Sequence, residues 1–247
     1  MKKQLLLISN STNPGEAYLG WPKRYIREFL VSNTVKEVLF VPYAGVNLSD
    51  MGLEMSFRVY ADKVNEVFGK MKVKLRSVAD EGDPVKAVKS ARAIVVGGGN
   101  TFHLVYMLHK LKLMDPIREK VISGTPFIGW SAGANIACPT LRTTNDMPIV
   151  QPRSFSCLDL VPFQINPHYL DANPAGHGGE TREQRILEFM VINPNVFVVG
   201  LRESSLLRIE GESMKLMGRK KMRLFHYDRD VKEFKPGSDL SFLLSNS

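Results

Sequence analysis

A serine set between two glycines is the feature of this chain that points most directly to chemistry. The segment Gly-Trp-Ser-Ala-Gly, residues 129–133, directly follows an apolar run. A chain that turns sharply from a strand into a helix needs small neighbours, because a Cβ atom two positions away would collide with the turn. The pattern predicts a nucleophile elbow with Ser131 at its tip, between a strand over 126–129 and a helix over 132–138. The pattern is short, so an ordinary tight turn stays open as the alternative.

A serine nucleophile needs a general base, and the chain contains five histidines. His168 closes an apolar strand in Gln-Ile-Asn-Pro-His, residues 164–168, downstream of the serine. An open α/β sheet collects its site at the carboxyl ends of its strands, so His168 is the favoured base and a loop histidine is the alternative. The other histidines have less suitable positions: His103 and His109 on one helix, His177 in a glycine-rich loop, and His226 near the C-terminus.

The base needs a carboxylate that orients its ring. Glu203 follows the apolar strand 196–201 and is the favoured acid, which makes the order Ser131, His168, Glu203. The usual α/β-hydrolase order would instead use Ser131, Glu203 and His226, with the base in a surface hairpin. Both orders stay open on these residues, and three further acidic residues compete for the role: Asp171, Glu180 and Glu183.

A second glycine cluster, residues 97–100, follows the strand expected over 93–96 and precedes a helix. It lacks both the Gly-Lys-Ser/Thr ending of a phosphate-binding P-loop and a complete G-x-G-x-x-G. We expect the backbone amides of Gly98 or Gly99, together with that of Ala132, to form an oxyanion hole, since glycine permits close approach. Plain turn formation is the alternative.

Short apolar strands alternate with amphipathic helices along the chain, which predicts an α/β fold with a mostly parallel sheet flanked by helices. A length of 247 residues is about the upper size for one core, so one domain over 1–247 is expected. Strands are expected at 4–9, 37–41, 73–78, 93–96, 126–129, 158–166, 196–201 and 206–209. Helices are expected within 57–71, from the Asp-Pro pairs at 83 and 115, and over 181–191. Strands 213–217 and 222–227 are expected to form a C-terminal β-hairpin that turns at Gly218.

The composition favours a cytoplasmic protein. No apolar run approaches the about 18 residues of a membrane span, and two cysteines, Cys138 and Cys157, cannot build a disulfide framework. Cys138 is also rejected as a nucleophile, because it lies about two helical turns beyond the elbow. The net charge of +8 has its densest basic run at 219–223, without interleaved aromatic residues, so no nucleic-acid partner is expected.

Blocks along nearly the whole chain resemble the peptidase E family, serine peptidases that cleave α-aspartyl dipeptides in a group that includes cyanophycinase. Many separate blocks in the same order make this resemblance specific. They are residues 9–12, 14–15, 41–45, 96–102, 128–135, 142–148, 164–168 and 176–185.

The resemblance implies a class I glutamine amidotransferase-like (flavodoxin-like) fold, with serine in place of the cysteine of those enzymes. It also implies a triad of Ser131, His168 and Glu203, and cleavage of dipeptides with an N-terminal aspartate without metal or cofactor. The chain departs from the family at one point. Glycine often follows the glutamate in the family, whereas Ser204 follows it here.

The side chain of a substrate aspartate needs a cation, and arginine can pair with a carboxylate through two hydrogen bonds. We expect Arg182 to bind this carboxylate and Asn100 to help position the substrate, with a surface arginine as the alternative. A β-aspartyl (cyanophycinase-like) peptidase and a non-catalytic amidotransferase-like binding module remain competing interpretations. The expected partner is a small peptide, with no nucleic acid and no membrane, and the chain is expected to be a monomer or a homodimer.

Overall fold

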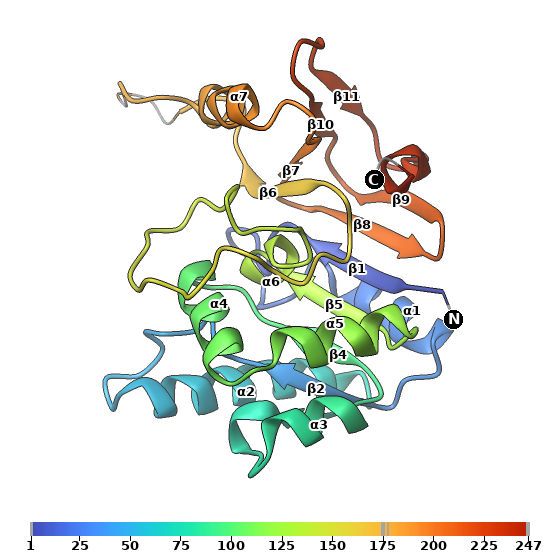
Figure 1. Ribbon diagram of the computed structural model, residues 1–247. Coiled ribbons are helices and arrows are strands. Elements are labelled where there is room, and N and C mark those ends of the chain that lie inside the picture. The colour runs from blue at the N-terminus through green and yellow to red at the C-terminus, as the bar shows by residue number, and fades with distance from the viewer. Residues whose placement is uncertain (1, 174–175, 177, 246–247) are drawn as a thin grey trace.

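Two β-sheets organise the chain in the computed structural model (Figure 1). Within residues 2–173, 176 and 178–245, which the structure describes, the larger sheet has seven strands in the order β3-β2-β4-β5-β1-β8-β9. The smaller sheet of these residues has four strands in the order β11-β10-β7-β6. The larger sheet comprises β1 (Gln4–Ile8), β2 (Glu37–Val41), β3 (Lys74–Ser77), β4 (Ile94–Val96), β5 (Phe127–Trp130), β8 (Ser205–Glu210) and β9 (Ser213–Gly218). The smaller sheet comprises β6 (Gln164–Tyr169), β7 (Val198–Arg202), β10 (Met222–Phe225) and β11 (Lys232–Phe234).

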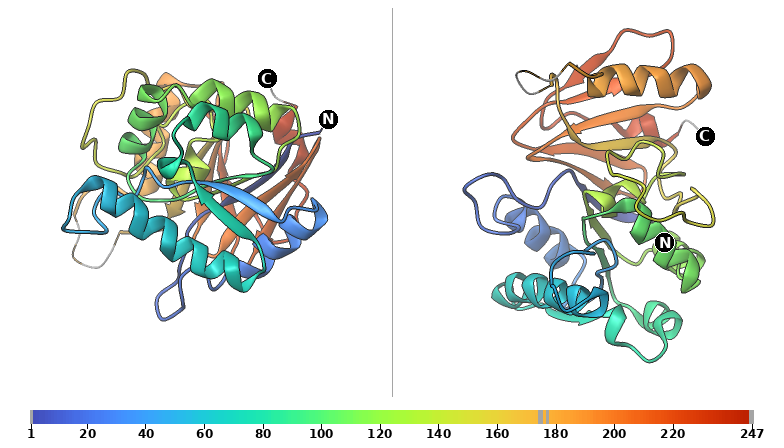
Figure 2. Two further views of the ribbon diagram at one scale, coloured as in Figure 1. Left: turned by 90° about the horizontal axis from the view of Figure 1, so that it is seen from below. Right: turned by 90° about the vertical axis from the view of Figure 1, so that its left-hand side faces the viewer.

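The larger sheet is parallel from β3 to β1 and becomes antiparallel at β8 and β9. Helices cover both of its faces (Figure 2). One face carries α1 (Lys23–Ser32) and most of α2 (Leu53–Lys70), and the other carries α3 (Pro84–Ser90), α4 (Thr101–Lys110), α5 (Met114–Ile122) and α6 (Ala132–Asn135). The expected α/β fold with a mostly parallel sheet flanked by helices is confirmed.

Burial on both faces explains why the central strands are continuous apolar runs. The β1 residues Leu5, Leu6, Leu7 and Ile8 are all fully buried. Because successive side chains of a strand point to opposite faces, Leu5 and Leu7 join the core cluster under α4 and α5, whereas Leu6 and Ile8 join the cluster under α1 and α2. β1 therefore holds the two halves of the core together.

The smaller sheet packs one face on the main core and the other on α7 (Arg182–Ile192). In β7, Val198 contacts the α7 side, whereas Val199 and Leu201 belong to the main core. Helix α7 begins at a capping box in which Thr181 and Gln184 satisfy each other's backbone amides. Its start close to residue 181 agrees with the sequence.

The expected C-terminal β-hairpin of 213–217 with 222–227 is wrong. β9 pairs with β8 in the larger sheet, whereas β10 pairs with β7 and β11 in the smaller one. Gly218, at φ +111°, ends β9 where a Cβ atom would lie 2.2 Å from the carbonyl oxygen of Ser204. The chain leaves the larger sheet at this point. Each strand instead forms a hairpin with another neighbour: β8 with β9, through a turn with Gly211 at φ +65°, and β10 with β11.

Two expected elements are shorter than the sequence suggested. The strand expected over 158–166 begins only at Gln164, and helix α6 ends at Asn135 instead of residue 138. Both differences have one cause. The amides of Leu158 and Leu160 donate to the carbonyl groups of Ile136 and Ala137, so the two segments satisfy each other. Among the described helices, none combines the length and apolar character needed to cross a membrane.

Candidate active site

Ser131 occupies the tight turn between β5 and α6 in a conformation that L-residues rarely adopt, φ +53° and ψ −115°. A Cβ atom on Gly129 would lie 2.2 Å from the carbonyl oxygen of Gly133. A Cβ atom on Gly133 would lie equally close, 2.2 Å, to the carbonyl oxygen of Val96. Glycine is therefore required on both sides of the serine, for the steric reason that defines a nucleophile elbow.

His168 lies between Ser131 and Glu203 and contacts both. Its Nε2 is 2.9 Å from Ser131 Oγ, and its Nδ1 is 2.7 Å from Glu203 Oε1. When Glu203 is ionised, Nδ1 carries the ring proton and donates a hydrogen bond to the carboxylate. Nε2 is then free to accept a hydrogen bond from the hydroxyl of Ser131. Side-chain exposures of 40% for His168 and 36% for Glu203 leave the relay accessible. The structure brings together the three residues that the sequence favoured.

The backbone around His168 explains how its ring reaches the serine. The pairing of β6 with β7 shifts register between Pro167 and Tyr169, so His168 is the extra residue of a β-bulge, at φ +52°. A bulge re-aims a side chain out of the regular strand pattern. The buried Ser9 hydroxyl accepts the His168 amide at 3.0 Å and donates to the Leu201 carbonyl at 2.7 Å. The residue after β1 thereby ties His168 to β7, the strand that precedes Glu203.

The competing histidines and acids have other partners. The ring of His226 packs on Phe197 at 4.4 Å between centroids, so the alternative order with His226 is not what the structure assembles. His177 lies outside the described residues. The remaining candidates contact other groups. His103 contacts the carbonyl of Tyr43, and His109 contacts that of Ser156. Each of the three acids pairs with an arginine: Asp171 with Arg202, Glu180 with Arg185, and Glu183 with Arg223.

Cys138 is fully buried, and its sulfur accepts the amide of Ile165 at 3.1 Å. Burial raises the pKa of its thiol far above the usual range. A thiol held neutral in the core cannot act as a nucleophile at neutral pH.

The glycine cluster after β4 packs directly on the serine. A Cβ atom on Gly98 would lie 2.8 Å from Ser131 Cβ, and Gly99 adopts φ +133°. Among the described residues, none accepts a hydrogen bond from the amides of Gly98, Gly99 or Ala132. These amides are therefore available to a negative oxygen that develops beside Ser131.

Tyr60 of α2 anchors this glycine cluster, a contact that the sequence did not predict. Its hydroxyl donates to the Gly98 carbonyl at 2.9 Å and accepts the Trp130 indole N–H at 3.0 Å. Burial raises the pKa of Tyr60 to about 12, so the hydroxyl keeps its proton. The two polar groups of a trans peptide point in opposite directions, so holding the Gly98 carbonyl also sets the direction of the Gly99 N–H.

These groups line a cavity of about 420 Å³. Ser131, His168, Gly98, Gly99 and Asn100 contribute to its wall, and the helix α2 contributes Tyr60 and Lys63. The sequence offered one signal for α2. Tyr60 is the member of its buried apolar stripe that carries a polar tip, and Lys63 follows three residues later on the same side of the helix.

Comparison with known proteins identifies the family to which the chain belongs. Residues 5–217 match the model of peptidase family S51. A protein named peptidase E from Nostoc sp. is 48% identical over 247 residues, covering 100% of this chain and 99% of that protein. The chain belongs to peptidase family S51. A peptidase E from Shewanella amazonensis is 41% identical over 244 residues, covering 99% of this chain and 100% of that protein.

The solved structure of a peptidase from an acI-B1 Actinobacterium has the same fold as this S51 peptidase. The two chains superimpose with a TM-score of 0.69 at 17% identity, and 98% of each chain is covered. Family membership makes the chain a peptidase, a hydrolase of peptide bonds.

Arg182 of the S51 peptidase does not line the cavity of Ser131. It lies at the start of α7 beside a smaller cavity of about 160 Å³, whose wall also contains Asn145, Asp146 and Asn166. The two cavities are neighbours, because Asn145 donates to the Pro167 carbonyl at 2.6 Å, one residue before His168. Burial, with the nearby Arg185, lowers the pKa of Arg182. Within the described part of the chain, Arg182 makes no ion pair.

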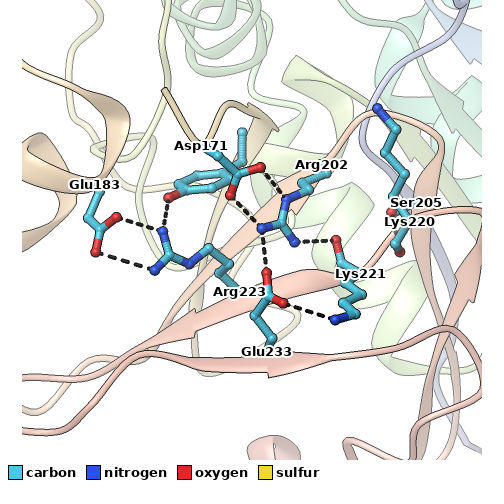
Figure 3. A network of polar contacts seen from close by, with 9 residues as sticks. Asp171, Glu183, Arg202, Ser205, Lys220, Lys221, Arg223 and Glu233 are labelled. Atoms are coloured by element: carbon cyan, nitrogen blue, oxygen red, sulfur yellow. Dashed lines mark hydrogen bonds and ion pairs between the residues drawn. The ribbon is translucent and has the colours of Figure 1, made fainter. Parts of the chain in front are cut away.

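An ion-pair network ties the segment after His168 to the strand before Glu203 (Figure 3). The Arg202 guanidinium bonds both carboxylate oxygens of Asp171 and, at 2.5 Å, Oε1 of Glu233. The hydrogen bond with Arg202 is the main cause that lowers the pKa of Asp171. Since Arg202 directly precedes Glu203 and Asp171 follows His168 by three residues, the network links the segments that carry His168 and Glu203.

The departure from the family pattern after Glu203 has a structural explanation. Ser204 adopts φ +65°, a left-handed conformation that glycine accepts without cost. Hydrogen bonds hold the serine there: its amide donates to Asn10 Oδ1 at 2.8 Å and its hydroxyl to Asn13 Oδ1 at 2.9 Å. The turn that positions Glu203 is therefore kept without glycine.

Proposed function

We propose that this S51 peptidase is a cytoplasmic serine-type dipeptidase that hydrolyses Asp-X dipeptides through an acyl-enzyme. The observation that carries the proposal is the pair of hydrogen bonds through which His168 joins Ser131 at 2.9 Å and Glu203 at 2.7 Å. A hydroxyl, an imidazole and a carboxylate in this order form the relay that activates a serine nucleophile.

In the proposed reaction, Ser131 Oγ attacks the carbonyl carbon of the peptide bond while its proton passes to His168 Nε2. Glu203 holds the ring in place and stabilises the imidazolium that results. The amides of Gly98, Gly99 and Ala132 donate hydrogen bonds to the oxyanion that forms. His168 then gives its proton to the leaving amine as the C–N bond breaks. Water attacks the resulting ester, its proton passes through His168 back to Ser131, and free aspartate leaves.

The substrate's aspartate side chain is assigned to Arg182, with Asn100 as a positioning residue. Asn100 lines the larger cavity and donates to the Met147 carbonyl at 2.8 Å, in the loop that also lines the smaller cavity through Asp146. Asn100 therefore lies next to the loop that lines the smaller cavity. A partly buried arginine with no ion pair among the described residues is a suitable partner for a carboxylate that enters from the larger cavity.

The test is the rate at which wild type and Ser131→Ala cleave Asp-Leu, β-Asp-Leu and Leu-Leu with EDTA present. We expect cleavage of Asp-Leu alone, and a loss on the order of 10⁶ in kcat in the mutant, as for other triad residues. Near-wild-type activity of Ser131→Ala would exclude the serine mechanism. Preference for β-Asp-Leu would indicate cyanophycinase-like chemistry, and no cleavage by a wild-type protein that also resists serine-directed acylating probes would indicate a binding module.

The role of Arg182 is tested separately with Arg182→Ala. We expect this variant to lose cleavage of Asp-Leu while any residual cleavage of Leu-Leu is unchanged. An equal reduction for both peptides would show that Arg182 does not select the aspartate.

A further inference from the structure

The cavity of Ser131 contains a positive charge that the proposed relay does not use. Of the described residues that line this cavity, Lys63 is the only lysine or arginine, and none is an aspartate or glutamate. Lys63 makes no ion pair with any described residue. The wall of the cavity that contains Ser131 therefore carries an uncompensated cation.

Lys63 is held at the cavity without being neutralised. Its ammonium nitrogen lies 4.4 Å from the centroid of the Tyr18 ring. The Tyr18 hydroxyl in turn lies 3.3 Å from that of Tyr60, the residue that anchors Gly98. The Tyr18 ring is partly buried whereas Lys63 is exposed, so the contact orients the ammonium group and leaves its charge available to an anion.

Lys63 and the loop beside Arg182 lie on opposite faces of the larger sheet. Lys63 belongs to the part of α2 whose Tyr60 and Val64 pack in the core cluster beneath α1 and α2. The loop beside Arg182 is tied to the other face, because Asp146 accepts the amide of Thr101 at the start of α4 at 2.7 Å. Ser131 directly follows β5, an inner strand, so it lies at the carboxyl edge of the parallel strands, between the two faces.

A dipeptide that crosses this edge would place its two residues on different sides of the serine. If the aspartyl side chain extends toward Arg182, the leaving residue extends toward α2. The C-terminal carboxylate of a dipeptide lies only one residue, about 3.5 Å of chain, beyond the scissile nitrogen. The carboxylate would then enter the part of the cavity that holds Lys63.

We propose that Lys63 binds the C-terminal carboxylate of the leaving residue and so selects dipeptides over longer peptides. This inference rests on the proposed function. In a longer peptide, the same position carries a neutral peptide group, which gains nothing from the ammonium. Lys63 therefore selects substrates by length, whereas Arg182 recognises the side chain of the first residue.

The experiment compares Asp-Leu, Asp-Leu amide and aspartyl p-nitroanilide as substrates of wild type and Lys63→Met. Only the first of these carries a carboxylate on the leaving side. We expect Lys63→Met to lower kcat/KM for Asp-Leu about tenfold, mainly through KM, and to leave the other two substrates within about twofold. Lys63→Arg should retain most of the preference for Asp-Leu, since it keeps the charge.

Lys70→Met is the matched control, because it removes the same charge from the same helix outside the cavity. Lys70 is exposed and pairs with Glu66, so we expect it to leave all three rates unchanged. An equal fall for all three substrates in Lys63→Met, or no change for Asp-Leu, would overturn the role of Lys63 alone. If the wild type cleaves none of the three, the proposed function itself is overturned, and the role of Lys63 with it.

Discussion

Tyr60→Phe tests whether the glycine cluster beside Ser131 depends on one buried hydroxyl. The substitution removes a single oxygen and keeps the ring, whose edge-to-face contact with Phe40 at 5.1 Å is unaffected. It leaves the Gly98 carbonyl and the Trp130 indole N–H without their partner. Trp130 is 1% exposed, so its N–H cannot turn to water instead.

The expected magnitude follows from these two groups. Leaving a buried polar group unpaired costs about 1–3 kcal/mol, and Gly98 is only partly buried, so we expect a total of about 2 kcal/mol in the free energy of unfolding. For a chain of this size, that corresponds to a fall of about 4–8 °C in Tm. A protein with a typical stability of 5 kcal/mol or more would still be over about 99% folded at 25 °C.

A separate effect on activity is expected in the folded fraction. Loss of one oxyanion donor costs about 10²–10³ in kcat, and a Gly99 amide that is present but loosely oriented should cost less, about 10–100-fold, with KM changed less than threefold. Urea unfolding and steady-state kinetics on aspartyl p-nitroanilide measure the two effects independently. Tyr18→Phe is the control, because it removes a neighbouring hydroxyl while the bond from Tyr60 to Gly98 remains.

The reasoning would be refuted if Tyr60→Phe lost stability but kept kcat within twofold of wild type. In that case, the hydroxyl would support the fold without orienting the Gly99 amide. A fall in kcat as large in Tyr18→Phe would refute it equally, because the effect could then not be assigned to the contact with Gly98.

Three other outcomes are expected from the same structure. Gly133→Ala should lower the free energy of unfolding by about 3 kcal/mol or more in urea, since its Cβ would lie 2.2 Å from a backbone oxygen. Gly69→Ala is the control on α2: its Cβ would meet open space, so the substitution should raise the free energy of unfolding by about 0.5–1 kcal/mol. Ser204→Gly should change the free energy of unfolding by less than about 1 kcal/mol, because relief of a positive φ offsets one lost hydrogen bond; a larger change in either direction would contradict this balance. Arg202 lowers the pKa of Asp171, so this pair stabilises the protein above the unfolded pKa of about 3.9 and ceases to do so as pH falls through the lower folded value. Thermal melts from pH 6 to 2 should therefore fall more steeply in wild type than in Arg202→Met, and parallel curves would exclude the pair as the cause.

The sequence predicted those parts of the fold and site that depend on local pattern. The apolar runs of β1 and β5 identify buried parallel strands, and the small residues around Ser131 are required by the turn itself. The sequence indicated His168 and Glu203 because His168 lies near the end of an apolar strand and Glu203 directly follows one, and the carboxyl ends of parallel strands meet at one edge of a sheet.

The features that the sequence could not predict depend on distant partners. β9 and β10 are both short strands, and nothing local shows that one pairs with β8 and the other with β7. The periodicity of α2 correctly buries Tyr60, but it cannot show that the hydroxyl contacts Gly98, 38 residues away. Arg182 illustrates the same limit: its block placed it near the site, yet it lines the neighbouring cavity and not that of Ser131.

The position of β1 between β5 and β8 has a consequence for synthesis on the ribosome. β1 is translated well before its two partners, because its parallel partner spans residues 127–130 and its antiparallel partner spans residues 205–210. Until both have been translated, a run of four leucine and isoleucine side chains that is fully buried in the folded protein has an unpaired edge. The nascent chain therefore carries an aggregation-prone segment until β8 has been made, and its yield in cells should depend on chaperones that shield apolar segments during translation.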